Sequence, residues 1–392
     1  MWSIRPPKAV TSSLALVARL EGETWRAGTL AAAKIRGWVG DLTAAPSALA
    51  PYGDGHGGPA SATCFVEARP ENLPPITFAY ERHGSGEPLV LLHGIGSHRQ
   101  AWDPIVPLLV AEHTVITVDL PGFGDSPDLP RDLSRDLPTM VTELGAMFTA
   151  LGLDLPHVAG HSLGGLIALR LAQAGLARSV TALAPAGFWT EAERRYAFAV
   201  LTAARNIARL PSWMVVRLAT TPIGRAALTG TLYGRPDRCP PGEVVTSLAI
   251  LRQSVAFNAT LRAGRASDLF VGDIPGVPVT IAWGSADRVL FARQAARAAA
   301  TIPRAHMVWL PGCGHVPMND APELVAHVIL EATRSSGLVG VHAPDLLPEG
   351  APLGADRPPL ISDAPLLTDE RVGCEGRGGV WTEERAGPRE RL

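Results

Sequence analysis

The sequence predicts an α/β protein with a mostly parallel, doubly wound sheet of eight strands and helices inserted after the sixth strand. Three observations predict it. Short apolar runs alternate with longer helical segments between residues 62 and 334. The later runs are nearly continuous in Val, Leu, Ile and Ala, as strands covered by helices on both faces should be. The interval 188–276 is too long for one crossover helix.

The elements follow from the pattern in chain order. Strands are expected at 63–69, 76–82, 88–93, 113–120, 157–161, 179–185, 277–283 and 305–311. Helical periodicity marks the segments 139–151, 163–173, 292–300 and 322–333. Within the interval 188–276, helices are expected at 191–210 and 244–261, so this interval should form a helical insertion above the strand ends.

The two ends differ from the middle, so the folded domain is expected at 61–335. Residues 1–60 should form an extension in which apolar residues recur at helical spacing from Leu16 to Leu42, followed by a Gly- and Pro-rich linker. Such a helix packs on its own domain or makes peripheral contact with a membrane surface. Residues 336–392 hold 7 Pro and 9 Gly among 57, which predicts a disordered tail.

Composition excludes several classes of protein. With 35 basic and 37 acidic residues the chain lacks the basic surplus of a nucleic-acid binder. Its cysteines form no CxxC pair, which argues against a zinc site or a disulfide scaffold and for a reducing, cytoplasmic compartment; they are Cys64, Cys239, Cys313 and Cys374. No apolar run is long enough to span a bilayer, and no cleaved signal peptide is expected.

The segment 157–173, "HVAGHSLGGLIALRLAQ", carries the strongest functional signal. It places Gly160, Ser162 and Gly164 in a G-x-S-x-G pattern between a predicted strand and a predicted helix. This is the context of a nucleophile elbow, in which a strained turn presents the serine hydroxyl at the strand end and the glycines leave room for the turn.

A serine nucleophile needs a base and an acid that orients the base. Asp287 follows one predicted strand, and His315 lies in a glycine-rich loop after the last one. The order Ser162, Asp287, His315 suits this architecture, because each residue lies beyond the carboxyl end of a strand. We interpret His93 and His161 as structural neighbours of the site.

A tetrahedral intermediate also needs two donors for its oxyanion. The backbone N–H of Leu163, at the start of the helix after the nucleophile, is one candidate. The second is the N–H of Ile95, in the loop after the strand 88–93, where Gly94 lets the backbone turn inward. Together these amides are predicted to form an oxyanion hole.

Five motifs in unbroken order now identify a resemblance: "LLHGIGSHRQAW" (91–102), "VDLPGFGDS" (118–126), "GHSLGG" (160–165), "WGSADRV" (283–289) and "PGCGHVP" (311–317). The chain resembles the α/β-hydrolase fold superfamily, in its cap-bearing branch of serine hydrolases and esterases. The resemblance implies the same triad and oxyanion donors, and a cap at 188–276. It makes Asp119 and Asp125 part of a structural turn. Family members often carry a proline two or three residues after the acid, where this chain has Val289 and Leu290.

The expected function is cleavage of a carboxylic ester of a small apolar substrate through an acyl-enzyme, without cofactor or metal. An acyltransferase, or a thioesterase, C–C bond hydrolase, lactonase or perhydrolase with the same triad, stays open, because one triad serves all these reactions. A non-catalytic binding module is the remaining alternative. The interval 188–276 holds eleven arginines against six acids, which are either solvated surface or a means of attracting anionic substrates.

Overall fold

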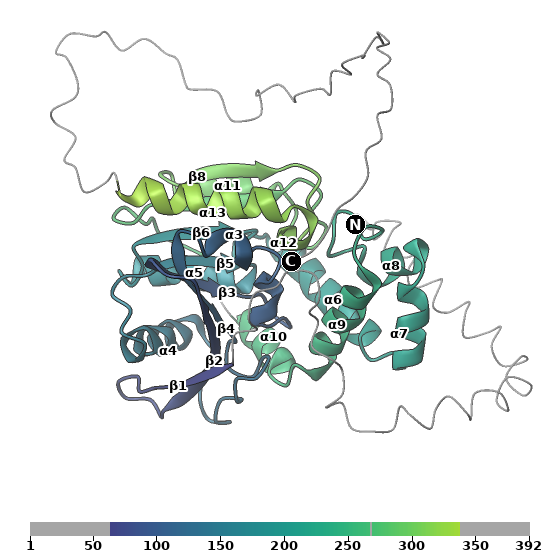
Figure 1. The fold of residues 1–392 in the computed structure, drawn as a ribbon, viewed down its shortest axis with the longest axis horizontal. Coiled ribbons are helices and arrows are strands. Elements are labelled where there is room, and N and C mark those ends of the chain that lie inside the picture. The colour runs from purple at the N-terminus through teal and green to yellow at the C-terminus, as the bar shows by residue number, and fades with distance from the viewer. Residues whose placement is uncertain (1–62, 267–268, 338–392) are drawn as a thin grey trace, which may run out of the picture. The chain divides into compact units, whose positions relative to one another are not determined.

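The computed structural model describes residues 63–266 and 269–337 of the chain (Figure 1). The predicted N-terminal extension (1–60) and nearly all of the predicted tail lie outside the described residues. The last described helix, α13 (Pro322–Gly337), runs two residues past the predicted domain end at 335.

The core is an eight-stranded sheet in the order β1-β2-β4-β3-β5-β6-β7-β8. The pairings β1–β2 and β2–β4 are antiparallel, and the other five are parallel, so the mostly parallel sheet predicted from the sequence is confirmed. Its strands are β1 (Cys64–Ala68), β2 (Ile76–His83), β3 (Glu87–Leu92), β4 (His113–Val118), β5 (His157–His161), β6 (Ser179–Leu183), β7 (Val279–Gly284) and β8 (His306–Leu310).

Helices cover both faces of the sheet, and the last four residues of β3 show why both of its sides are apolar. Val90 and Leu92 pack into one apolar cluster and Leu89 and Leu91 into another, because successive side chains of a strand point to opposite faces. The first cluster includes residues of α4 (Leu137–Ala150), α5 (Leu163–Gln173) and α11 (Gln294–Thr301); the second includes residues of α3 (Val106–Leu109) and α13.

The segment between β6 and β7 is helical. It contains α6 (Glu191–Ile207), α7 (Ser212–Ala219), α8 (Pro222–Thr229), α9 (Pro241–Gln253) and α10 (Phe257–Ala266). In Figure 1 these helices stand to the right of the sheet, with α7 and α8 at the outer edge. They share a separate apolar cluster that includes Phe198, Val215 and Leu248. Helix α6 starts at a capping box, in which Thr190 and Glu193 each bond the other's backbone N–H.

The continuous helix predicted over 244–261 is wrong. Two helices, α9 and α10, meet there with a bend of 75°. The break is held by contacts from elsewhere in the chain: Ala256 N–H donates to the carbonyl of Gly122 (3.2 Å), and Arg205 Nη2 donates to the carbonyl of Ser254 (2.9 Å). The apolar periodicity of 244–261 does not depend on these distant contacts, so the sequence pattern alone predicted a single helix.

Within 63–266 and 269–337, no single helix is long and apolar enough to cross a membrane. The pair α9 and α10 meets that criterion only when its two bent halves are taken together.

Candidate active site

Ser162 occupies a sharp turn between β5 and α5. Its backbone has φ +54° and ψ −111°, a conformation that is strained for a residue with a Cβ. The turn is tightly packed, because a Cβ on Gly160 would collide with the carbonyl of Gly164, and one on Gly164 with the carbonyl of Leu92. The G-x-S-x-G pattern therefore has a steric basis in this structure.

The structure brings Ser162, His315 and Asp287 together at the carboxyl ends of β5, β8 and β7. His315 Nε2 lies 3.1 Å from Ser162 Oγ, and His315 Nδ1 lies 2.8 Å from Asp287 Oδ2. Because the carboxylate can only accept, Nδ1 carries the hydrogen and Nε2 is left to accept the serine hydroxyl. All three residues are buried. The arrangement can pass a proton from the serine to the imidazole.

Asp287 is fixed by two further hydrogen bonds. Its Oδ1 accepts from the backbone N–H of Val289 (2.8 Å) and of Leu290 (2.9 Å), while Oδ2 faces His315. Val289 and Leu290 stand where the family often has a proline, which lacks an N–H. Because Val289 and Leu290 keep their backbone N–H groups, both can donate hydrogen bonds to the Asp287 carboxylate.

The loop of His315 is held by residues that the sequence analysis did not single out. The carboxylate of Asp320 accepts from the backbone N–H of Gly314 (2.7 Å) and of Gly234 (2.8 Å). The backbone N–H of His315 donates to the carbonyl of Leu232 (2.7 Å). These bonds join the loop to the segment after α8, 80 or so residues earlier, and the sequence carries no signal for pairs so far apart.

His93 and His161 lie beside the triad as structural residues, as predicted. His93 Nε2 accepts from Leu120 N–H (3.0 Å) and Nδ1 donates to the carbonyl of Gly94 (2.7 Å). His161 Nε2 donates to the carbonyl of His315 (2.6 Å). Burial lowers the pKa of His93 to about 4 and, with the neighbouring His315, the pKa of His161 to about 3. Both rings are therefore neutral near pH 7.

The two predicted oxyanion donors lie at the nucleophile. Leu163 is the first residue of α5, directly after Ser162. Ile95 follows Gly94, on which a Cβ would lie 3.2 Å from Ser162 Cβ, so this loop passes close over the serine. Ile95, Ser162 and Leu163 line one cavity.

Asp119 and Asp125 are structural, as the resemblance implied. Buried Asp119 pairs with the guanidinium of Arg99 and accepts from the backbone N–H of Arg99 (2.6 Å) and of Asp125 (2.9 Å). These bonds close the turn after β4. Neither carboxylate contacts Ser162 or His315 among the described residues.

A cavity that is open to solvent extends from Ser162. Its walls come from the loop after β3, from α4 and α5, and from α6 and α10; they are mostly apolar, with Leu137, Met140, Leu166, Phe198, Leu201 and Leu261 among them. Such a cavity offers an apolar surface beside the hydroxyl of Ser162. Within the described part of the chain, no group of three or more His, Cys, Asp or Glu residues could hold a metal ion.

The sheet, the covering helices and the turn at Ser162 together define the α/β-hydrolase class of fold. Residues 89–328 match the family model described as the alpha/beta hydrolase family, which is more than half of the chain. The chain belongs to this family.

Similar proteins include an esterase. An uncharacterized protein of Mycobacterium tuberculosis is 29% identical over 258 residues, which cover 62% of this chain and 74% of that protein. A pimeloyl-[acyl-carrier protein] methyl ester esterase of Aeromonas hydrophila is 42% identical over 97 residues, 25% of this chain and 36% of that protein. The solved structure of a bacterial membrane phospholipase A has a TM-score of 0.55 at 22% identity, and the match covers 85% of this chain and 99% of that one. At this level of identity the similarity supports the fold of this chain and nothing further.

Proposed function

We propose that this protein is a serine hydrolase that cleaves a carboxylic ester of a small apolar substrate through an acyl-enzyme. The observation that carries the proposal is the hydrogen-bonded series from Ser162 Oγ through the His315 ring to Asp287, at one side of an apolar cavity. The esterase among the similar proteins supports ester chemistry.

In the acylation step, Ser162 Oγ attacks the ester carbonyl carbon while His315 Nε2 takes the hydroxyl proton. Asp287 holds the ring in the required tautomer and stabilises the imidazolium that forms. The tetrahedral intermediate collapses, the bond to the alcohol oxygen breaks, and His315 returns the proton to the leaving alcohol. The acyl group is then joined to Ser162.

The negative charge on the carbonyl oxygen would be met by the backbone N–H groups of Leu163 and Ile95. The amide of Leu163 belongs to the first turn of α5, where the helix dipole also favours negative charge. The amide of Leu163 directly follows the strained turn at Ser162.

In the deacylation step, water gives a proton to His315 Nε2 and attacks the acyl carbon, and Ser162 leaves with the proton from the imidazolium. Apart from the attacking water, both steps use side chains and backbone groups of this chain. We further propose that the helices of 188–276 act as the cap, because α6 and α10 supply walls of the cavity.

The test is Ser162→Ala, assayed with a fluorophosphonate probe and with aryl esters of graded acyl length. We expect loss of covalent labelling and a fall in turnover of several orders of magnitude. Ser335→Ala, at an exposed position near the end of α13, is the matched control and should change neither the covalent labelling nor the turnover. Near-normal turnover by Ser162→Ala would contradict the mechanism. Adding an alcohol acceptor and analysing the products separates hydrolysis from acyl transfer.

A further inference from the structure

Besides Ser162, a cationic and a hydroxyl-bearing side chain line this largely apolar cavity. They are the guanidinium-bearing Arg135, just before α4, and the hydroxyl-bearing Thr260 on α10. Neither takes part in the triad or in its hydrogen bonds.

Arg135 places a cation in this otherwise apolar wall. Its side chain is 9% exposed; Nη1 donates to the carbonyl of Pro121 (3.0 Å), and Nη2 pairs with Asp128. The side chain of Asp128 is 47% exposed, so solvent screens this pair and it offsets the buried charge only in part. A cation so placed favours an anion in the cavity.

The hydroxyl of Thr260 is a second feature of the cavity wall, independent of the Arg135 cation. The residue is 4% exposed, and its buried hydroxyl has no hydrogen-bond partner among the described residues. A buried hydroxyl left without a partner costs about 1–3 kcal/mol. The neighbouring cavity residues on α10, Leu261 and Gly264, offer it none, so the hydroxyl keeps an unused hydrogen-bonding capacity at the cavity wall.

The two groups are joined through one tight contact. Arg135 bonds Pro121 and Asp128, and a Cβ on the intervening Gly122 would lie 2.5 Å from both Asp128 Oδ1 and Ala256 Cβ. Ala256 lies one helical turn before Thr260, whose N–H donates to the Ala256 carbonyl (2.9 Å). The loop that holds the guanidinium and the helix that carries the hydroxyl therefore meet at the same wall.

We propose that Arg135 and Thr260 form a subsite for a carboxylate on the acyl chain of the substrate, remote from the ester carbonyl. This proposal rests on the proposed ester hydrolysis and names its substrate class: half-esters of dicarboxylic acids. The carboxylate accepts from the guanidinium and from the Thr260 hydroxyl. The apolar walls of the same cavity, which include Met140 and Leu166, contact the methylene chain.

The experiment compares matched pairs of 4-nitrophenyl esters. One member of each pair is the half-ester of adipic, pimelic or suberic acid, and the other has a methyl group in place of the free carboxylate. The quantity measured is the ratio of kcat/KM for the two members. In the unaltered protein we expect at least one half-ester to be preferred, by about tenfold, as for a charge-assisted hydrogen bond.

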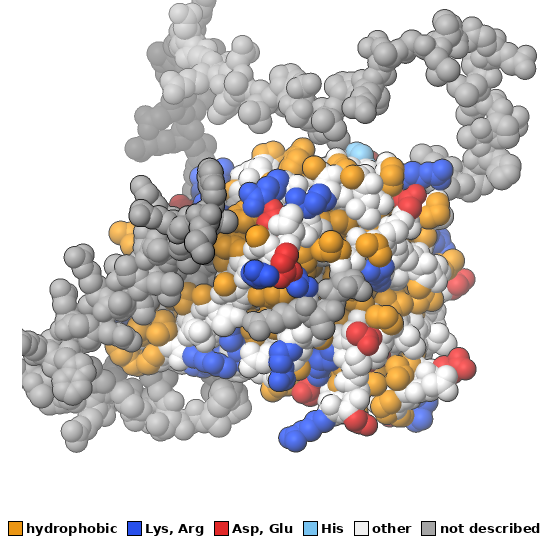
Figure 2. Space-filling model, turned by 180° about the vertical axis from the view of Figure 1, so that it is seen from behind, with side chains coloured by type: hydrophobic (Ala, Val, Ile, Leu, Met, Phe, Trp, Pro, Cys, Tyr) orange, Lys and Arg blue, Asp and Glu red, His pale blue; other side chains and the backbone are white. Residues whose placement is uncertain are grey.

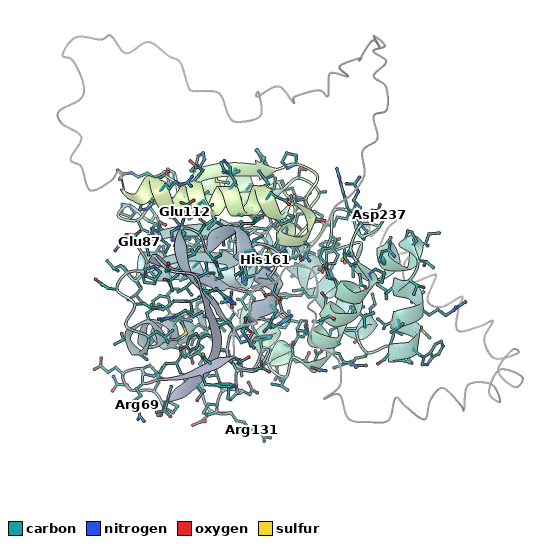
Figure 3. All side chains as sticks on the ribbon, in the orientation of Figure 1. Arg69, Glu87, Glu112, Arg131, His161 and Asp237 are labelled. Atoms are coloured by element: carbon teal, nitrogen blue, oxygen red, sulfur yellow. The ribbon has the colours of Figure 1, made fainter. Side chains whose placement is uncertain are left out.

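Variants of the subsite should change this ratio. Arg135→Gln combined with Asp128→Asn, which removes the pair without leaving a lone carboxylate, should abolish the preference. Thr260→Val keeps the shape and should reduce it by about threefold to tenfold. Arg131→Gln is the control, because Arg131 extends away from the body of the molecule (Figure 3) and should leave the ratio unchanged.

A binding measurement separates failure of this inference from failure of the proposed function. Calorimetry on Ser162→Ala should show tighter binding of the half-ester than of its methyl-ended partner. Hydrolysis of both esters without preference would overturn the carboxylate subsite and leave the serine hydrolase intact. Absence of turnover together with preferential binding would retain the subsite and overturn ester hydrolysis. Absence of both would overturn both.

Discussion

Glu143 shows how one buried side chain can make the stability of this protein depend on pH. It lies on α4, is 1% exposed, and its Oε1 has no hydrogen-bond partner within the described residues. Burial, with a smaller contribution from Asp136, raises the pKa of its carboxyl from 4.5 to about 7, although the charge of Arg135 opposes the shift. The folded state therefore holds a proton that the unfolded chain loses first.

We predict that the contribution of Glu143 to stability is present below pH 4.5 and is lost as pH rises to about 7. Glu143→Gln keeps the shape and cannot ionise. The loss of unfolding free energy between pH 5 and pH 8 should therefore be smaller in this variant, by about 2–3 kcal/mol. Denaturant unfolding at pH 5 and at pH 8 measures this loss. An equal loss of unfolding free energy in Glu143→Gln and in the unaltered protein would contradict the prediction.

In the proposed mechanism, Asp320 acts at one remove from Ser162, Asp287 and His315. Its two oxygens accept from three backbone N–H groups, those of Gly234, Arg235 and Gly314. Gly314 directly precedes His315, so the carboxylate sets the position of the base without touching it.

Asp320→Ala should lower the free energy of unfolding by about 2–4 kcal/mol, because three amides lose a charged acceptor. It should also lower kcat more than it changes KM, since His315 is misplaced and the cavity is intact. Asp320→Asn keeps one oxygen acceptor and should recover part of both losses. If Asp320→Ala changed stability alone, with kcat unaltered, the positioning role would be wrong.

At the scale of elements, α6 carries a buried cation that is only partly satisfied. The guanidinium of Arg205 lies 5.2 Å from the ring centroid of Phe257, and its Nη2 bonds the carbonyl of Ser254. Its Nε and Nη1 are buried with no partner among the described residues, and burial, with repulsion from Arg209, lowers its pKa. The residue links α6 to the break between α9 and α10 at an energetic cost.

We predict that Arg205→Met stabilises the protein by about 1–2 kcal/mol, because methionine keeps the apolar contact with Phe257 and removes the unpartnered N–H groups. Thermal unfolding at pH 7 measures the change as a rise in Tm. Arg217→Met, at an exposed position on α7, is the control and should leave Tm nearly unchanged. A fall in Tm for Arg205→Met would show that the bond to Ser254 outweighs the buried charge.

At the scale of the whole molecule, positive charge is unevenly distributed. The chain has a net charge of −2, yet residues 188–276 hold eleven arginines and six acids. The blue side chains on the face in Figure 2 are all arginines, because the two lysines, Lys8 and Lys34, lie outside the described residues. The interval 188–276 thus carries a formal charge of +5 (11 − 6), and two of its helices, α6 and α10, line the cavity.

If this charge attracts substrate, kcat/KM for an anionic ester should fall as salt rises from 0.02 to 0.5 M, whereas a neutral analogue should not respond, since ions screen the attraction. The double variant of Arg135 and Asp128 separates this long-range effect from the proposed subsite, because it leaves the net charge unchanged and should keep the salt response. Equal responses of the two esters would mean that the arginines are solvated surface.

The sequence alone predicted the features that depend on local pattern and on chain order. All eight strands were found from apolar runs, and the turn at Ser162 from two glycines that the structure shows to be sterically required. Asp287 and His315 were found because the carboxyl ends of parallel strands meet at one edge of a sheet. The sequence could therefore predict which residues approach Ser162 without any knowledge of their distances.

Tertiary structure alone decided what depends on contacts between distant segments. The bend after Gln253 is held by Gly122 and Arg205, and the loop of His315 is held by Asp320 and Leu232. The same holds for the contact between Ala256, just before α10, and the loop bonded by Arg135. Hydrophobic periodicity reports only which face of an element is buried. It does not report which hydroxyl, amide or guanidinium finds a partner, because that is settled by the packing of residues far apart in the chain.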